Sequence, residues 1–302
     1  MDVSIAYKAD NSVGESPFWS NTKKSLYWVD IIGKSLNMFT PTTMQFKNWF
    51  FDDFVCGVVP TSNGMLCVAL QHDLLQFDAA NNCFCKLMEI ESNAPQNRIN
   101  EIKCDTKGRL WIGTMQNNIE ADGAICSITK NSGALYLICN NNAIQIETDI
   151  GISNTLAWDD VRNVFYFADS SKDLIWRYQF SPDSGTIMAR REYFSGQGVG
   201  FPDGSAIDVD GNLWNARFGA GCIVKIDPKG RLMQKIELPV TNPTSCCFGG
   251  ENNSILYVTS ARVALSEDML KKNPYEGSIV AIQTNTKGED TKRWIRNEPS
   301  EQ

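Results

Sequence analysis

The chain has 302 residues, and its 28 Lys and Arg against 35 Asp and Glu give a formal net charge of −7, which repels phosphate backbones and argues against a nucleic-acid partner. Hydrophobic residues make up 42% and charged residues 21%, which suits a folded protein with a sizeable core and excludes a disordered chain. No stretch reaches the roughly 18 apolar residues of a membrane-spanning helix, and the N-terminus lacks the order of a secretion signal, so we expect a cytoplasmic protein without membrane contact.

Short strand-like segments recur along the chain, each preceded by turn residues such as NTKK, TSNG or DTKG. In chain order they are SLYWVD (25–30), GMLCVA (64–69), GRLWIGT (108–114), NVFYFAD (163–169), GNLWNAR (211–217) and SILYVTSAR (254–262). Their aligned residues, Tyr27, Cys67, Trp111, Tyr166, Trp214 and Tyr257, lie 40, 44, 55, 48 and 43 residues apart. A period of this length is typical of propeller blades.

A further strand-like segment follows each of these: KSLNMFT, DLLQFD, GAICSIT (123–129), LIWRYQF, CIVKID and GSIVAI. Only SEDMLKKNP (266–274) has helical periodicity, so the fold class is all-β. The six repeats predict a six-bladed β-propeller of four-stranded blades, forming a single domain over 1–302. Because little strand-like sequence follows GSIVAI, we expect VSIAYKAD (3–10) to supply the last outer strand and close the ring. A β-sandwich, the main alternative, does not explain the repeat.

The sequence contains one histidine, His72, and this excludes several chemistries. A clustered-histidine zinc site is impossible, and Ser-His-Asp or Cys-His catalysis would depend on His72, which no G-x-S-x-G motif accompanies. We therefore expect His72 to be a surface or packing residue. The ten cysteines lack zinc-finger and redox-motif spacing, so we expect them to stay reduced.

One register of the repeat carries polar residues in several blades. The segments that precede the turns should run beside the central channel, and counting back from the aligned positions gives Glu15, Val55, Asn100, Asn154, Asp203 and Thr244. In a closed ring, the four polar residues at blades 1, 3, 4 and 5 meet at one mouth of the channel. Two carboxylates that meet there need a cation or a proton between them. Carboxylate and amide oxygens favour Ca²⁺, Mg²⁺ or Mn²⁺ over Zn²⁺.

These residues also have plainer explanations, which remain open at this stage. Asn154 and Asp203 are residue types that cap turns, and Glu15 in VGESP suits a solvated loop. Turn capping, however, does not require matching positions in successive repeats. The shared register therefore favours a common site.

The chain resembles the senescence-marker-protein/gluconolactonase/regucalcin-like lactonase family along nearly its whole length. The matching stretches, in order, are GESPFW, YWVD, NRINEIKCD with GRLWIGTM, ISNTLAW, FPDGSAIDVDGNLWNA, and TSCCFGG with LYVTSAR. The resemblance implies a six-bladed propeller and one divalent cation (Ca, Mg, Mn, Fe or Zn) held by Glu15, Asn154 and Asp203. It also implies that Arg98 and Asn100 contact a sugar lactone.

The chain departs from this family at two places near the expected mouth. The family commonly has N-D-G-K where this sequence has Asn100-Glu101-Ile102-Lys103. Glu101 adds a methylene and Ile102 replaces a glycine, so we expect a reshaped pocket with Glu101 beside the substrate. Asn118 stands where some relatives offer a carboxylate to the substrate, and we place it in the substrate site as well.

Lactone hydrolysis can proceed with these residue types and without histidine. A bound cation polarises the carbonyl and lowers the pKa of a water molecule, whose proton Asp203 is expected to accept. Arg98 would donate to the oxyanion or to substrate hydroxyls, and Asn100 would orient the ring. We predict a monomeric lactonase that opens a small-molecule sugar lactone, of the gluconolactone kind, to its aldonic acid. The alternatives are a non-catalytic calcium-binding propeller of the regucalcin type and a hydrolase of other lactones or esters.

Overall fold

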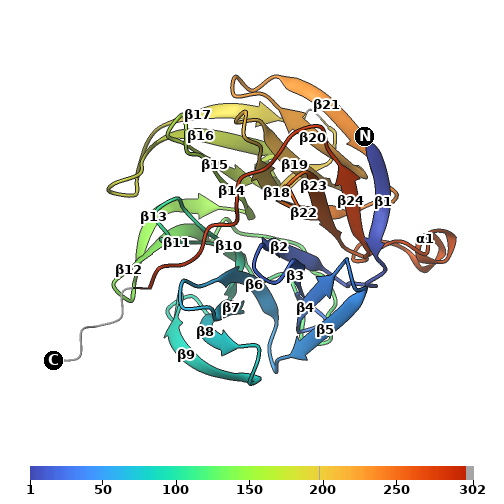
Figure 1. Ribbon diagram of the computed structural model, residues 1–302. Helices are drawn as coiled ribbons and strands as arrows, with labels where there is room; N and C mark the ends of the chain where they lie inside the picture. Colours follow the sequence, from blue (N-terminus) through green and yellow to red (C-terminus); the bar gives the residue numbers. More distant parts are fainter. Residues whose placement is uncertain (197, 297–302) are drawn as a thin grey trace.

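The computed structural model describes residues 1–196 and 198–296 of the chain. Its strands form six four-stranded antiparallel sheets, arranged around a central axis as blades (Figure 1). The protein is therefore the six-bladed β-propeller that the repeat predicts. Each inner strand contacts the inner strand of the next blade, and the last returns to the first, so the ring is closed. From blade 1 to blade 6 the inner strands are β2 (Gly14–Ser20), β6 (Val55–Pro60), β10 (Asn97–Cys104), β14 (Ser153–Asp159), β18 (Phe201–Ile207) and β22 (Pro243–Gly249).

The remaining strands follow outward from the channel in each blade. The second strands are β3 (Ser25–Asp30), β7 (Leu66–Leu70), β11 (Leu110–Gln116), β15 (Val164–Asp169), β19 (Leu213–Phe218) and β23 (Ile255–Ser260). The third strands are β4 (Ser35–Thr40), β8 (Asp73–Asp78), β12 (Gly133–Cys139), β16 (Leu174–Ser181), β20 (Cys222–Ile226) and β24 (Ile279–Gln283). The outer strands are β5 (Gln45–Phe50), β9 (Cys83–Glu89), β13 (Asn142–Ile150), β17 (Thr186–Ser195), β21 (Leu232–Glu237) and β1 (Asp2–Tyr7).

In residues 1–196 and 198–296, helical structure is limited to a 3₁₀ turn, η1 (Ser170–Lys172), and one short helix, α1 (Glu267–Lys272). The α1 helix lies within the segment that has helical periodicity in the sequence, and the Ser266 side chain caps it by accepting from the Met269 N–H. Within the described ranges, no helix has both the length and the apolar character that crossing a membrane requires.

The sixth blade takes its outer strand from the N-terminus, as predicted. Strand β1 pairs antiparallel with β24, with Val3 opposite Ile282 and Ile5 opposite Val280. Val3 and Ile5 also pack against the apolar cluster that blades 5 and 6 share. The pairing covers the edge of β24, and it ties the start of the chain to a strand near its end.

Blade 3 differs from the sequence prediction. Its third strand is β12 at Gly133–Cys139, where six of the seven residues are buried, and not the segment 123–129. Residues 123–129 are exposed or half-buried and belong to a long connection, 117–132, between β11 and β12. The Gln116 side chain holds this connection by accepting from the Thr129 N–H at 2.9 Å. The prediction failed because both segments are rich in apolar residues, and the second, a nearly continuous apolar run, is the buried one. The connection also explains the long spacing between Trp111 and Tyr166.

Two of the predicted turns, in blades 3 and 5, form equivalent buried hydrogen bonds. Asp105 Oδ2 accepts from the Trp111 indole N–H, and Asp208 Oδ2 accepts from that of Trp214, both at 3.0 Å. Asp208 also pairs with Lys225 at 2.9 Å. The carboxylate thus joins the turn, the second strand and the third strand of one blade. This explains why DTKG and DVDG precede tryptophan-containing strands.

The chain after β24 crosses one mouth of the channel (Figure 1). We call residues 284–296 the C-terminal strap. Backbone hydrogen bonds tie it to the blades. The Val209 N–H of blade 5 donates to Lys287 O at 2.9 Å. In the strap, the Trp294 N–H donates to Pro60 O of blade 2 and the Ile295 N–H donates to Gly108 O of blade 3, both at 2.8 Å. Further contacts reach blade 4, where Lys292 pairs with Asp160 at 2.8 Å, and blade 1, where Thr291 donates to Trp19 O at 3.0 Å. The strap therefore joins the blades and covers this end of the channel.

The cysteine and histidine predictions agree with the structure. All ten cysteines are free thiols, and six of them are buried. His72 is half-buried in the turn between β7 and β8, where its Nε2 lies 3.2 Å from the Gln71 amide.

Replacing Asp208 by Ala tests the turn bond. The change leaves the Trp214 indole N–H and the Lys225 ammonium without their buried partner, so we expect the free energy of unfolding to fall by about 3 kcal/mol. Asp210→Ala, in the exposed part of the same turn, should change it by less than about 0.5 kcal/mol. Urea denaturation of both variants measures the difference, and equal losses would contradict a special role for Asp208.

Candidate functional site

The predicted polar register lies at the mouth of the channel opposite the C-terminal strap. Glu15 is near the start of β2, whereas Trp19, near the end of the same strand, contacts the strap. The ligand candidates are largely buried, with exposed fractions of 6% for Glu15, 4% for Asn154 and 9% for Asp203. Asn100 is half-buried at the same level. The structure thus gathers the four residues that the repeat aligned.

The inner strands depart from regular pairing at this register. The pairing shifts between Glu15 and Phe18 in β2, between Asn154 and Ala157 in β14, and between Pro202 and Ser205 in β18. The other three inner strands have shifts at the equivalent place. Such bulges re-aim side chains and occur often beside active sites. The irregularity therefore turns the site residues toward the mouth.

The residues that follow two of the ligand candidates have left-handed backbone conformations. Ser16 has a φ of 50° and Thr155 a φ of 55°, which is unfavourable for side chains with a Cβ. Their hydroxyls hold them in place. Ser16 Oγ accepts from the Val58 N–H at 3.0 Å in blade 2, and Thr155 Oγ1 donates to Asp203 O in blade 5. Each strained residue is therefore anchored to the inner strand of the next blade.

A chain of amides connects the predicted substrate residues to Asn154. The Asn154 amide N–H donates to Ser170 Oγ at 2.8 Å, so its Oδ1 faces the other way and lies 3.3 Å from Asn100 Nδ2. Asn100 Oδ1 in turn accepts from the Arg98 guanidinium at 2.7 Å. Arg98 also donates to Asn118 Oδ1 at 3.1 Å. The guanidinium is thus fixed beside the mouth, and its buried Nε has no hydrogen-bond partner among the residues that the structure describes.

Three buried carboxyl groups lie close together at the base of the mouth. Burial raises the pKa of Glu15 well above its usual value, and Asp203 and Glu101 raise it further. The pKa of Asp203 is raised by burial and then by Glu101, and Glu15 lies within hydrogen-bonding reach of it. None of the three forms an ion pair with a described Lys or Arg. The three carboxyl groups can therefore all be ionised only at a cost, which a proton or a cation between them would relieve.

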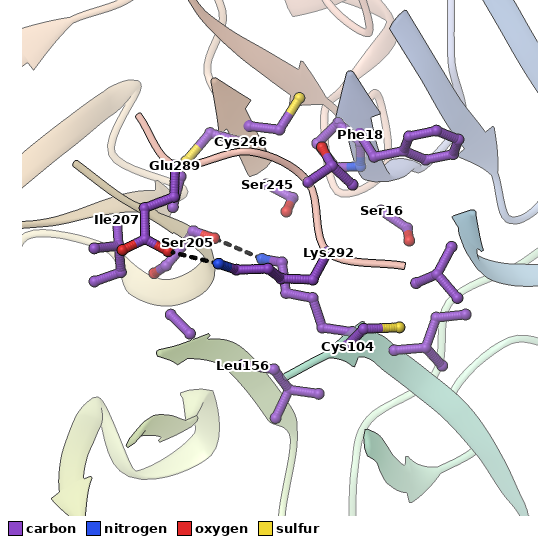
Figure 2. A pocket seen from close by; sticks show the side chains of 18 of the residues that line it. Ser16, Phe18, Cys104, Leu156, Ser205, Ile207, Ser245, Cys246, Glu289 and Lys292 are labelled. Atoms are coloured by element: carbon purple, nitrogen blue, oxygen red, sulfur yellow. Dashed lines mark hydrogen bonds and ion pairs between the residues drawn. The ribbon is translucent and has the colours of Figure 1, made fainter. Parts of the chain in front are cut away.

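Glu101 marks the boundary between this mouth and the interior of the channel. It is 2% exposed, and its Oε2 has no hydrogen-bond partner in the described part of the chain. A cavity of about 120 Å³ begins beside it and continues to Glu289 and Lys292 of the strap (Figure 2). Ile102, the other departure from the family pattern, packs against Gly57 of blade 2. A Cβ at Gly57 would lie 2.7 Å from the Ile102 side chain, so the larger residue fits because its neighbour is glycine.

Lys103 is a channel residue that the sequence analysis did not single out. Its Nζ donates to Ser205 O at 2.6 Å, and Lys103 lines the cavity. Its charge lowers the pKa of Glu101, against the larger effect of burial. The sequence signal for this residue was a lysine inside the predicted inner-strand segment INEIKC (99–104), which the structure shows to be mostly buried.

Asn118 belongs to the connection 117–132, which passes beside the mouth. Its backbone carbonyl accepts from the Cys126 N–H at 2.9 Å, and its side chain contacts Arg98. The tip of the connection contacts blade 1, because a Cβ at Gly123 would lie 2.9 Å from the Ile32 side chain. The connection therefore links blade 3 to blade 1 across this side of the ring.

The donor set suits a hard divalent cation. No group of three His, Cys, Asp or Glu side chains in the described ranges is placed to hold a metal, so the Asn154 amide oxygen must complete any set that contains Glu15 and Asp203. Two unbalanced buried carboxylates with an amide oxygen match the preferences of Ca²⁺, Mg²⁺ or Mn²⁺. All seven residues named from the sequence lie around this mouth, while their individual roles stay predictions.

Comparison with known proteins places this arrangement in a family. Residues 13–262 match the model of the SMP-30/Gluconolactonase/LRE-like region. The chain is 32% identical to regucalcin of Danio rerio, over 93% of this chain and 94% of that protein. It is 31% identical to a 6-deoxy-6-sulfogluconolactonase of Pseudomonas putida, over 91% and 92% of the two chains. Among solved structures, a luciferin-regenerating enzyme superposes with a TM-score of 0.89 at 27% identity, covering 98% and 99% of the two chains.

The carboxylate cluster predicts how the metal-free protein responds to pH. Because the folded protein raises the pKa values of Glu15 and Asp203, their contribution to stability is complete below about pH 4 and is lost as the pH rises through the raised values. We expect Glu15→Gln to remove part of the stability loss that accompanies the rise in pH, because glutamine does not ionise. In chelator, its melting temperature should exceed that of the wild type at neutral pH, and the two should converge in acid.

The control is Glu267→Gln, which neutralises an exposed carboxylate on α1. Its melting temperature should follow the wild type across the pH range. A Glu15→Gln variant that is less stable than the wild type at neutral pH in chelator would contradict the charge argument.

Proposed function

Since the chain belongs to the SMP-30/gluconolactonase/LRE-like family, we propose that it is a metal-dependent lactonase that opens a sugar lactone to its aldonic acid. The observation that carries the proposal is the meeting of two buried, unbalanced carboxylates with an oriented amide and a fixed guanidinium at one mouth of the channel. The sulfogluconolactonase relative supports a lactone of an aldonic acid as the substrate class.

Glu15, Asn154 and Asp203 are the residues that would hold the divalent cation. When bound, such a cation supplies Lewis acidity, which polarises a carbonyl and lowers the pKa of water. The hydrogen bond from Asn154 Nδ2 to Ser170 fixes the orientation of the Asn154 amide, so its one oxygen points away from Ser170, and the left-handed backbone at Ser16 fixes the direction of Glu15. The protein thereby sets the positions of two of the three oxygen donors before any ligand enters.

Arg98 and its amide partners bind and orient the lactone. The guanidinium is held by Asn100 and Asn118, and it keeps donor groups for the lactone carbonyl oxygen or for ring hydroxyls. The Asn100 side chain is already committed to Arg98, Ser153 and Asn154, so it acts mainly by positioning these groups. Glu101, at the base of the mouth, shapes the deepest part of the pocket with its carboxylate.

Asp203 moves the proton. A water molecule attacks the lactone carbonyl carbon, and Asp203 accepts the proton that this water loses. The bond between the carbonyl carbon and the ring oxygen then breaks, and the same proton passes to the ring oxygen, which becomes a hydroxyl of the aldonic acid. Burial raises the pKa of this carboxyl in the metal-free protein, and a cation held by Asp203 would lower it again.

Asp203→Asn tests the assignment directly. We expect its kcat/KM for gluconolactone to fall by roughly 100-fold or more, because the variant loses a carboxylate donor and the proton acceptor. The assay follows acid release at constant pH with metal-stripped protein reconstituted in turn with Ca²⁺, Mg²⁺, Mn²⁺, Fe²⁺ and Zn²⁺.

The matched control is Asp210→Asn, which lies in an exposed turn of the same blade and should retain full activity. Circular dichroism establishes that both variants are folded. Full activity of Asp203→Asn would refute the assignment. Absence of acid release by the wild type with every metal and lactone, despite saturable metal binding, would instead identify a non-catalytic cation binder.

Arg98→Lys separates substrate binding from metal binding. Lysine keeps the charge and loses the forked geometry that Asn100 and Asn118 hold, so we expect kcat/KM to fall by about 10-fold or more. The calorimetric affinity for Ca²⁺ should stay within about 3-fold of the wild type. A parallel loss of Ca²⁺ affinity would mean that Arg98 supports the cation site and not the lactone.

A further inference from the structure

A second pocket lies on the outer part of blade 4, away from the channel. Its volume is about 280 Å³, and three arginines line it: Arg162 from the turn between β14 and β15, Arg177 from β16, and Arg191 from β17. The candidate active site uses inner strands, whereas Arg177 and Arg191 lie on the two outermost strands of the blade. The two sites are therefore separate.

Arg177 and Arg191 face each other across neighbouring strands. Tyr166, Arg177 and Arg191 occupy one row across β15, β16 and β17, which places their side chains on the same face of the sheet. Like charges directly opposite each other destabilise a sheet. Beside this row, β17 contains a bulge, and Ala189 in the pocket wall has a left-handed φ of 51°. The opposed arginines and the irregular backbone thus occur at the same place in the sheet.

The charges of this pocket are only partly balanced by the protein. Arg162 pairs with Asp159 at 2.8 Å, and Asp210 also lies near it. By contrast, neither Arg177 nor Arg191 forms an ion pair with any carboxylate in residues 1–196 and 198–296. The Arg177 Nε is buried and has no hydrogen-bond partner there. Two guanidinium groups thus stand together uncompensated, on a protein of net charge −7.

Arg190 provides the contrast within the same strand. It points to the opposite face, where it pairs with Glu147 at 3.2 Å and lies 5.2 Å from the centre of the Trp176 ring. Arg190 therefore has both a carboxylate partner and an aromatic partner within the protein. Arg177 and Arg191 have neither a carboxylate nor an aromatic ring over which to stack in the described structure.

We propose that this pocket binds the phosphate group of a small phosphorylated molecule. The planar fork of a guanidinium matches the oxygens of a tetrahedral oxyanion, and two such groups supply bidentate contacts from both sides. The volume accommodates a phosphate together with a small attached group. The buried Nε of Arg177 is a donor without a partner among the described residues, and such an oxyanion would accept its hydrogen bond. The negative charge of the oxyanion would also offset the repulsion between Arg177 and Arg191.

The experiment titrates inorganic phosphate into the wild type, Arg177→Gln, Arg191→Gln and Arg190→Gln by calorimetry at constant ionic strength. We expect saturable 1:1 binding to the wild type and to Arg190→Gln, with at least 10-fold weaker binding to the other two variants. Arg191 is exposed, so its replacement tests the pocket even where Arg177→Gln does not fold. Equal affinities in all four proteins, or no saturable binding to the wild type, would overturn the proposal.

Two further titrations define the ligand and the location. Sulfate should compete with phosphate because it shares the tetrahedral oxyanion geometry, whereas equal competition by acetate would mean simple charge attraction and would overturn the proposal. Phosphate should bind Asp203→Asn as tightly as the wild type. Loss of binding in that variant would place the phosphate at the channel mouth and would also overturn it.

Discussion

Closure of the ring is the constraint on which the rest of the structure depends. Pairing of β1 with β24 completes the last blade, and β22 of that blade lies against β2 of the first. That contact brings Glu15, near the start of the chain, beside Asp203, far along it. Two buried carboxylates that repel each other are held together by packing and pairing elsewhere in the ring. The site is therefore a product of the whole fold and not of any local motif.

The strands supply the second half of this arrangement by departing from regular pairing at one level. Bulges occur in all six inner strands where the site residues lie, although blades 2 and 6 contribute no candidate donor. The irregularity thus belongs to the repeated architecture. At this bulged position, individual blades carry a carboxylate, an amide or an apolar residue. Because the hydroxyls of Ser16 and Thr155 bond to the next blade, local strain at the site is coupled to contact between blades.

Much of this could be predicted from the sequence, because repetition makes equivalent positions visible. The six blades, the closing N-terminal strand and the common register of Glu15, Asn154 and Asp203 all follow from spacing and turn residues. The third strand of blade 3 is assigned wrongly from the sequence, since residues 123–129 and Gly133–Cys139 are both rich in apolar residues and only the second is buried. The partnership of Ile102 with Gly57 was also hidden, because it joins two blades through a contact that no repeat encodes.

The C-terminal strap has a consequence for how molecules pass through this propeller. Trp294, Lys292 and their neighbours cross the end of the channel that faces away from Glu15, whereas Arg98 and Asn118 lie at the other end. We therefore expect a ligand at Arg98 to enter and leave by the mouth beside it. Substrate entry and product departure would then exclude one another, so a ring-opened acid that lingered at Arg98 would block the next turnover.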